Sequence, residues 1–139
     1  MNVQSIMTPR PRVCSAGVPL AHAARLMLEQ DVGEIPVTDD EMRPIGVITD
    51  RDIVLRCVAV GGSAQDVTVD SCMTAPAQTV RDDATLEECA QLMARHRIRR
   101  VPIVDANGAI CGIVAQADLE ATDARSLKQQ VAERVSTPH

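Results

Sequence analysis

The chain has 139 residues, of which 45% are hydrophobic and 24% charged, as is typical of one or two small globular domains. Its net charge of −5 argues against a surface that binds duplex nucleic acid. Phe, Tyr and Trp are all absent, which excludes aromatic stacking platforms and aromatic cages. With no bilayer-spanning stretch and no export signal in the sequence, we expect a soluble cytoplasmic protein that binds neither nucleic acid nor membrane.

The first part of the chain predicts a strand, a helix, two strands and a second helix. The helix is indicated by apolar residues at i, i+3, i+4, i+7 and i+8, with Pro19 suited to its first turn. A proline and an acidic turn at residues 39–41 mark the two short strands. In chain order we expect a strand around 13–14, a helix over 20–31, strands over 35–38 and 45–49, and a helix over about 50–60.

The same order of elements recurs further along the chain. Met7-Thr8 maps onto Met73-Thr74, an offset of 66 residues, and Asp52 maps onto Asp118 without a gap. Thr85 and Glu88 have the spacing of a capping box, and the Asn-Gly pair at 107–108 predicts a hairpin turn. The second copy therefore predicts a strand around 79–80, a helix over 86–97, strands over 101–104 and 111–115, and a helix from about 116.

These elements predict an α+β fold built from two β-α-β-β-α repeats. A unit of about 60 residues is marginally stable alone, so we expect the repeats to pack about a pseudo-two-fold axis and to form two related clefts. Glycines at 61–62 mark the connection between them. The expected divisions are residues 1–62, residues 63–125 and a helical tail over 126–139.

The five cysteines, at positions 14, 57, 72, 89 and 111, lie in or beside apolar stretches and form no C-x-x-C pair. We interpret them as small buried residues in a reducing compartment. No metal site is expected, because the three histidines supply no ligand spacing. No arrangement typical of a catalytic centre is evident, so no enzyme activity is predicted. A redox function remains an alternative, with Cys14 or Cys72 as the reactive thiol.

The motifs themselves resemble the cystathionine-β-synthase (CBS) domain. The resemblance rests on residues 6–9, 33–37 and 46–53 in the first copy and on residues 72–74, 99–105 and 112–114 in the second. It implies a tandem CBS pair over residues 1–125, of the kind found as a stand-alone bacterial protein. It further implies a regulatory module that binds AMP, ADP, ATP, NAD or S-adenosylmethionine between its halves. Such a module requires no other cofactor, is usually a homodimer, and acts on an effector protein that the sequence does not name.

The ligand motif of that family falls on Gly46, Val47, Ile48, Thr49 and Asp52. An ionised aspartate can accept two hydrogen bonds from a ribose diol, and the threonine hydroxyl can reach ribose or phosphate. Both residues stand at a helix N-terminus, which favours anions. The alternative interpretation is a capping box made by Thr49 and Asp52, and the two roles are compatible.

The resemblance places phosphate at the entry to the strand over 101–104. Arg99 and Arg100 precede this strand and are the candidate cations. A solvated helix end is the alternative explanation for this basic segment. The remaining nucleotide-binding candidates form apolar walls for adenine or lie at the strand entry: Ile48, Thr79, Val80, Ile98 and Val101.

The two copies differ at these positions. Ala115 replaces the threonine of the motif in the second copy, and Gly33 and Glu34 replace the two arginines in the first. One cleft is expected to combine Thr49 and Asp52 with Arg99 and Arg100, and the second to combine Asp118 with Gly33 and Glu34, beside Val13 and Ile35. The second cleft is therefore expected to be the weaker one. We expect one tightly bound nucleotide per chain. A thiol-based redox module and a purely dimerising module remain the alternative functions.

Overall fold

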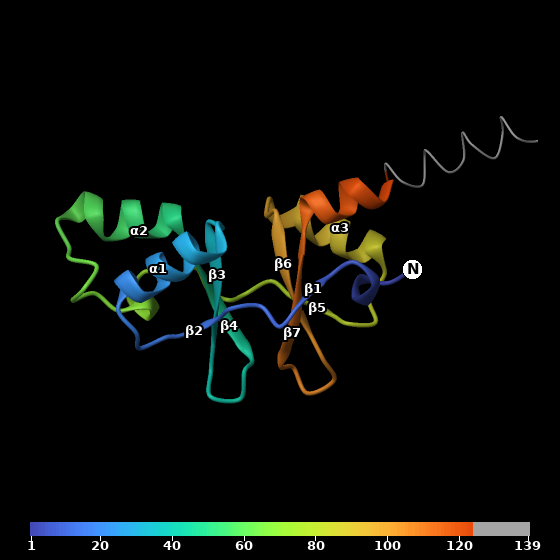
Figure 1. Ribbon diagram of the computed structural model, residues 1–139, viewed down its shortest axis with the longest axis horizontal. Helices are drawn as coiled ribbons and strands as arrows, with labels where there is room; N and C mark the ends of the chain where they lie inside the picture. Colours follow the sequence, from blue (N-terminus) through green and yellow to red (C-terminus); the bar gives the residue numbers. More distant parts are fainter. Residues whose placement is uncertain (124–139) are drawn as a thin grey trace, which may run out of the picture.

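The computed structural model describes residues 1–123, and the predicted helical tail over 126–139 lies outside the described residues. The described chain forms two halves side by side, each a small sheet with helices packed at one end and a hairpin projecting at the other (Figure 1). This arrangement confirms the predicted α+β fold of two repeats. None of the helices within residues 1–123 has the length and hydrophobicity that a membrane-spanning helix requires.

The first half follows the predicted element order. The elements are β2 (Cys14–Ser15), α1 (Leu20–Gln30), β3 (Glu34–Thr38), β4 (Pro44–Thr49) and α2 (Asp50–Arg56). The sheet has the order β2-β3-β4, with β2 parallel to β3 and β3 antiparallel to β4. Helix α2 is shorter than predicted, because the chain leaves it at Cys57 for the short 3-10 helix η2 (Val58–Val60) and then Gly61 at a φ of 81°.

The second half repeats this arrangement. Its elements are β5 (Val80–Arg81), α3 (Leu86–His96), β6 (Arg100–Val104), β7 (Ile110–Ala115) and a helix that begins at Gln116 and continues to the end of the described chain. With β1 (Thr8–Pro9), the strands form a sheet of order β1-β7-β6-β5. Thr85 caps α3 by accepting the Glu88 N–H at 3.1 Å, and Gly108 forms the predicted hairpin turn at a φ of 80°.

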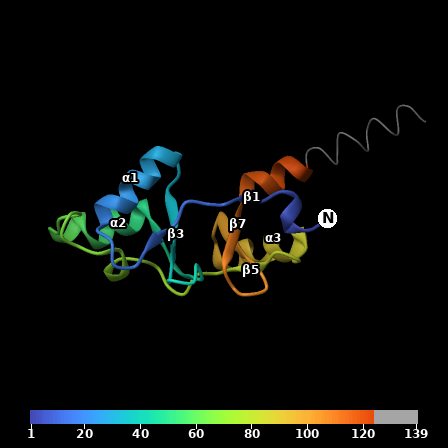
Figure 2. The same cartoon turned by 60° about the horizontal axis from the view of Figure 1, so that its bottom comes forward.

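Each half is completed by a segment that precedes the repeat of the other half. Val3, in the 3-10 helix η1 (Val3–Ser5), is buried in the core of the second half, and β1 (Thr8–Pro9) pairs with β7. Val69, in η3 (Val69–Ser71), is buried in the core of the first half, and Thr74 pairs with Val47 of β4. In Figure 2 the chain from the N-terminus crosses from the second half to the first. This exchange joins the two halves through their backbones.

Candidate functional site

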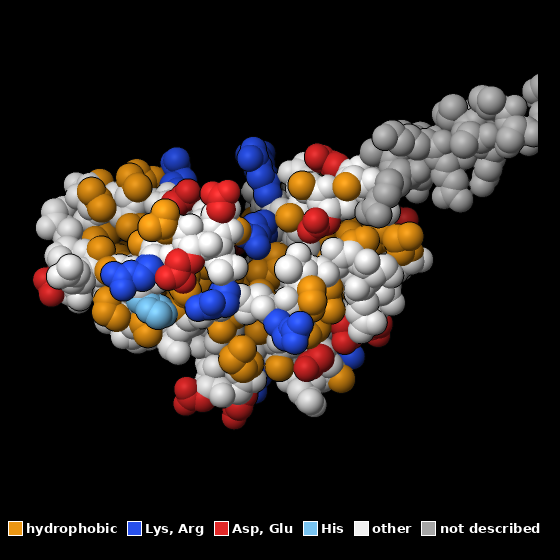
Figure 3. All heavy atoms as spheres, viewed as in Figure 1, with side chains coloured by type: hydrophobic (Ala, Val, Ile, Leu, Met, Phe, Trp, Pro, Cys, Tyr) orange, Lys and Arg blue, Asp and Glu red, His pale blue; other side chains and the backbone are white. Residues whose placement is uncertain are grey.

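A cavity of about 230 Å³ lies between the two halves. It is smaller than the roughly 300–1,000 Å³ of most small-molecule sites, so in this conformation it suits a phosphate-sized group. Figure 3 shows basic side chains, in blue, at the hollow between the halves. The polar residues that line the cavity are Thr8, Arg12, Gln30, Glu34 and Arg100.

Arg99 and Arg100 line different hollows of the molecule. Arg100 lines the cavity between the halves. Arg99 lines a groove of about 490 Å³ between α3 and the helix that begins at Gln116. Neighbouring residues at the start of a strand point to opposite faces, which explains the separation. Of the two predicted cations, only Arg100 therefore faces the space between the repeats.

Arg100 is half-buried, and its Nε is buried without a hydrogen-bond partner, the one such side-chain nitrogen or oxygen among the described residues. A buried guanidinium N–H that makes no hydrogen bond is costly, because its interaction with water is lost and not replaced. An acceptor oxygen supplied by a ligand would satisfy it. The Nε–H of Arg100 thus lacks a hydrogen-bond acceptor that a ligand could supply.

Glu34 lines the same cavity as Arg100. Burial raises the pKa of Glu34 to about 7; the positive charge of Arg100 opposes this rise, and the negative charge of Asp52 adds to it. A folded-state pKa above the usual glutamate value means that the folded protein holds this proton more tightly than the unfolded chain does. The contribution of Glu34 to stability is therefore largest below about pH 4.5 and is lost as the pH rises to about 7.

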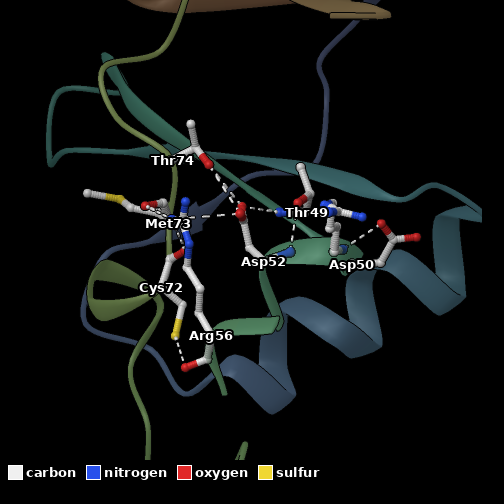
Figure 4. A network of polar contacts seen from close by, with 8 residues as sticks. Thr49, Asp50, Asp52, Arg56, Cys72, Met73 and Thr74 are labelled. Atoms are coloured by element: carbon white, nitrogen blue, oxygen red, sulfur yellow. Dashed lines mark hydrogen bonds and ion pairs between the residues drawn. The ribbon is translucent and has the colours of Figure 1, made fainter. Parts of the chain in front are cut away.

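Asp52 is 7% exposed and fastens three parts of the first half together (Figure 4). It forms the predicted capping box of α2: its carboxylate accepts the Thr49 N–H at 3.0 Å, and the Thr49 hydroxyl accepts the Asp52 N–H at 3.0 Å. The carboxylate also accepts the Thr74 hydroxyl at 3.2 Å and lies 3.7 Å from an Arg56 nitrogen. The structural role of the motif is thus established.

Asp118, the counterpart of Asp52, has fewer partners. Its carboxylate accepts the Ala115 N–H at 2.9 Å, but Ala115 has no hydroxyl to return the bond. Thr8, the counterpart of Thr74, lines the cavity, and within residues 1–123 no hydrogen bond joins it to Asp118. The replacement of the motif threonine by Ala115 is therefore accompanied by fewer hydrogen bonds to Asp118 than to Asp52 among the described residues.

The apolar candidates divide between the cores and the surface of the two halves. Ile48 and Val101 are fully buried, and Ile35 is 1% exposed although it borders the cavity. Ile98 lines the same groove as Arg99. Val13 and Thr79 stand directly before β2 and β5 and are half-buried, as is Val80 in β5. Of all predicted site residues, the cavity brings together Glu34, Ile35 and Arg100.

Three polar residues at the cavity were not predicted as site residues: Thr8, Arg12 and Gln30. Thr8 and Arg12 belong to the segment that crosses between the halves, and no local pattern shows which half that segment joins. The proximity of Glu34 and Arg100, in contrast, can be predicted from the sequence. The two positions are equivalent under the 66-residue offset, and equivalent residues beside a two-fold axis face each other.

Cys14, one of the two candidate reactive thiols, lacks the lowered pKa of a redox-active thiol. Cys14, Cys57, Cys72 and Cys89 are buried, and all five thiols are free. Burial raises the pKa of Cys14 to about 11 and also raises the pKa values of Cys89 and Cys111, whereas a redox-active thiol needs a lowered pKa. In the described part of the chain, no three His, Cys, Asp or Glu side chains are grouped to hold a metal ion.

Comparison with known proteins identifies both repeats. The family model described as "CBS domain" matches residues 3–58 and 66–121. The chain is 40% identical to the CBS domain-containing protein YhcV of Bacillus subtilis over 118 residues, which cover 85% of this chain and 82% of that protein.

Two crystal structures share the fold. The structure of hypoxic response protein I with two coordinated zinc ions matches at a TM-score of 0.81 and 30% identity, covering 87% of this chain and 98% of that one. The structure of CBSX2, a CBS-pair protein from Arabidopsis thaliana, in complex with AMP matches at a TM-score of 0.76 and 30% identity, covering 91% and 98%. With the two matched repeats, these likenesses show that the chain belongs to the CBS domain family, as a regulatory CBS pair.

Proposed function

We propose that this CBS pair senses an adenosine-containing ligand, AMP, ADP, ATP, NAD or S-adenosylmethionine, bound between its repeats with an anionic group at Arg100. The observation that carries the proposal is the buried, unpartnered Nε of Arg100, a residue that lines the cavity between the halves. A charge-assisted hydrogen bond from this nitrogen to a phosphate oxygen would satisfy it. The AMP complex of the similar protein CBSX2 supports the choice of ligand.

Isothermal titration calorimetry of the full chain with AMP, ADP, ATP, NAD, S-adenosylmethionine and adenosine tests this proposal. We expect one tight site per chain and tighter binding of AMP than of adenosine, because only AMP offers an anion to Arg100. Absence of binding by every one of these compounds would contradict the proposed function. Two equal sites per chain would contradict the expected difference between the clefts.

Asp52 is the proposed acceptor for the ribose hydroxyls. A carboxylate has about four lone-pair sites, so bonds from Thr49 and Thr74 leave it capacity for a diol. Loss of a charged acceptor costs about 1.5–3 kcal/mol, and Asp52→Ala should weaken AMP binding by about 10- to 100-fold.

Because Asp52 also caps α2, this binding is measured at a temperature where circular dichroism shows the variant fully folded. Asp118→Ala is the matched control at the equivalent position, and it should bind AMP as the unmodified chain does. Equal AMP affinity for Asp52→Ala and the unmodified chain would exclude the ribose role.

The chain is also proposed to form a homodimer through the outer faces of its helices. Leu28 in α1 is 82% exposed and Val54 in α2 is 52% exposed, and both line an apolar groove of about 350 Å³. The groove beside α3 occupies the equivalent place in the second half and is lined by Ala90, Met93, Ala94, Ile98 and Leu119. Figure 3 shows apolar side chains, in orange, over the helices of the first half. Exposed apolar surface on related helices favours burial against a second copy.

Multi-angle light scattering checks the dimer. The unmodified chain is expected at the mass of two chains, and Leu28→Glu at the mass of one, because the dimer would bury an unpaired carboxylate. Met42→Glu is the control, since Met42 is exposed in the turn between β3 and β4, away from the helices (Figure 1). A monomeric unmodified chain, or a dimeric Leu28→Glu variant, would contradict this interface.

A further inference from the structure

Glu34 and Arg100 are an opposite-charge pair at equivalent positions of the two repeats. Glu34 begins β3 and Arg100 begins β6, and both line the cavity between the halves. A sequence with two identical repeats would place two like residues here. This chain places an anion and a cation instead, so the cavity contains both a binding group for anions and a group that repels them.

The two side chains influence each other without forming a contact pair. The positive charge of Arg100 lowers the pKa of Glu34 against the larger effect of burial, so the groups lie within electrostatic range. Among the described residues, however, no ion pair or hydrogen bond joins them, and the Nε of Arg100 has no acceptor. The charge of Arg100 is therefore partly neutralised by Glu34, while its Nε–H has no acceptor among the described residues.

The charges around Glu34 come from three parts of the chain: β6, the first turn of α2 and the crossing segment. Arg100 faces it from β6, Asp52 acts on it from the first turn of α2, and Arg12 lines the same cavity from the crossing segment. Asp50 lies beside the preceding residue, Gly33. The other polar residues of the cavity, Thr8 and Gln30, do not titrate. Two cations and two other acidic groups thus surround one carboxyl group that is poised to change its charge near neutral pH.

We infer that the carboxylate of Glu34 competes with the ligand anion for Arg100, so that binding of an anion in the cavity is coupled to protonation of Glu34. This inference rests on the proposed function, since it concerns the anionic group of the same ligand. An unprotonated Glu34 would repel that group in a partly buried cavity, where screening by water is weak. Protonation removes the repulsion and leaves Arg100 to the ligand.

The direction of the pH dependence follows from linkage. An anion bound beside Glu34 stabilises the protonated carboxyl group and therefore raises its pKa above the ligand-free value of about 7. Binding then strengthens as the pH falls through this range. A rise of about one pKa unit corresponds to an affinity about 10-fold higher at the acidic end than at the alkaline end. Glu34→Gln, which is neutral at every pH, removes this dependence.

The experiment is an NMR pH titration of the full chain with ¹³C-labelled glutamate side chains. The Glu34 carboxyl signal is assigned by its loss in Glu34→Gln. Titrations are compared for the ligand-free chain and for the chain saturated with AMP, with adenosine, or with sulfate, whose charge is constant across the range. We expect AMP and sulfate to raise the pKa of Glu34 by about one unit and adenosine to leave it unchanged. The sulfate effect should be lost in Arg100→Gln, whose fold is checked by circular dichroism.

The outcomes separate this inference from the proposed function. If AMP binds and the pKa of Glu34 stays unchanged or falls, the inference is overturned and the proposed function stands. If no adenosine compound binds, the proposed function fails, and the sulfate titration alone tests whether Glu34 competes with an anion for Arg100. A sulfate-induced rise that requires Arg100 supports competition at this cavity, and an unchanged pKa in sulfate overturns it.

Discussion

Replacing Arg100 with alanine is expected to abolish the preference of the protein for AMP over adenosine. Arg100 is the cation of the predicted pair that faces the cavity between the repeats, and its Nε is buried without a partner. A hydrogen bond to a charged group contributes about 1.5–3 kcal/mol, and a partly desolvated phosphate left without its cation adds to the loss. The affinity for AMP should fall by about 100-fold, and that for adenosine by less than about three-fold.

Arg99→Ala is the matched control for this variant. Both substitutions remove one positive charge at adjacent positions, so they change the long-range field of the protein equally. Arg99 lines the groove beside α3 and not the cavity, and its removal should leave AMP binding within about two-fold. Calorimetric titration of both variants with AMP and adenosine measures the difference. An Arg100→Ala variant that still prefers AMP would contradict the anion site, and equal losses in both variants would show that only net charge matters.

The secondary structure was predictable because its signals are local. The apolar spacing of α1, the Asn-Gly pair at 107–108 and the threonine at the start of α2 each act within a few residues. The 66-residue offset then related the two halves. Helix α2 ends earlier than the sequence predicts, because apolar residues at 58–60 continue the helical pattern although the chain forms a 3-10 turn there.

The candidate site was only partly predictable, because it is made by contacts between distant segments. The sequence shows that Glu34 and Arg100 break the symmetry of the repeats, and it predicts Arg100 in the cleft of Thr49 and Asp52 but Glu34 in the weaker cleft. The structure places them in one cavity, because both stand where the two halves meet. Nor did the sequence show that residues 1–9 complete the second half, since burial of Val3 against the other repeat has no local signature.

Gly46, the glycine of the ligand motif, lies where the segment that connects the repeats packs closely against β4. A Cβ at position 46 would lie 2.8 Å from the Thr74 carbonyl oxygen and 3.0 Å from the sulfur of Met73. That carbonyl oxygen accepts the Val47 N–H at 2.9 Å, and the Thr74 N–H donates to the Val47 oxygen at 2.8 Å. The segment that connects the repeats can therefore pair with β4 only where β4 has no side chain.

Gly46→Ala is accordingly expected to lower the free energy of unfolding by about 2–4 kcal/mol, from overpacking against backbone and from weakened pairing with Thr74. Displacement of Thr74 also withdraws its hydroxyl from Asp52, so the proposed ribose acceptor loses a positioning contact. Gly17→Ala is the control, because nothing lies within 4 Å of a Cβ there, and it should change stability by less than about 1 kcal/mol. Urea denaturation followed by circular dichroism compares the two variants. Equal stability of Gly46→Ala and Gly17→Ala would mean that the connecting segment moves aside without cost, and that the motif glycine is not required for the halves to join.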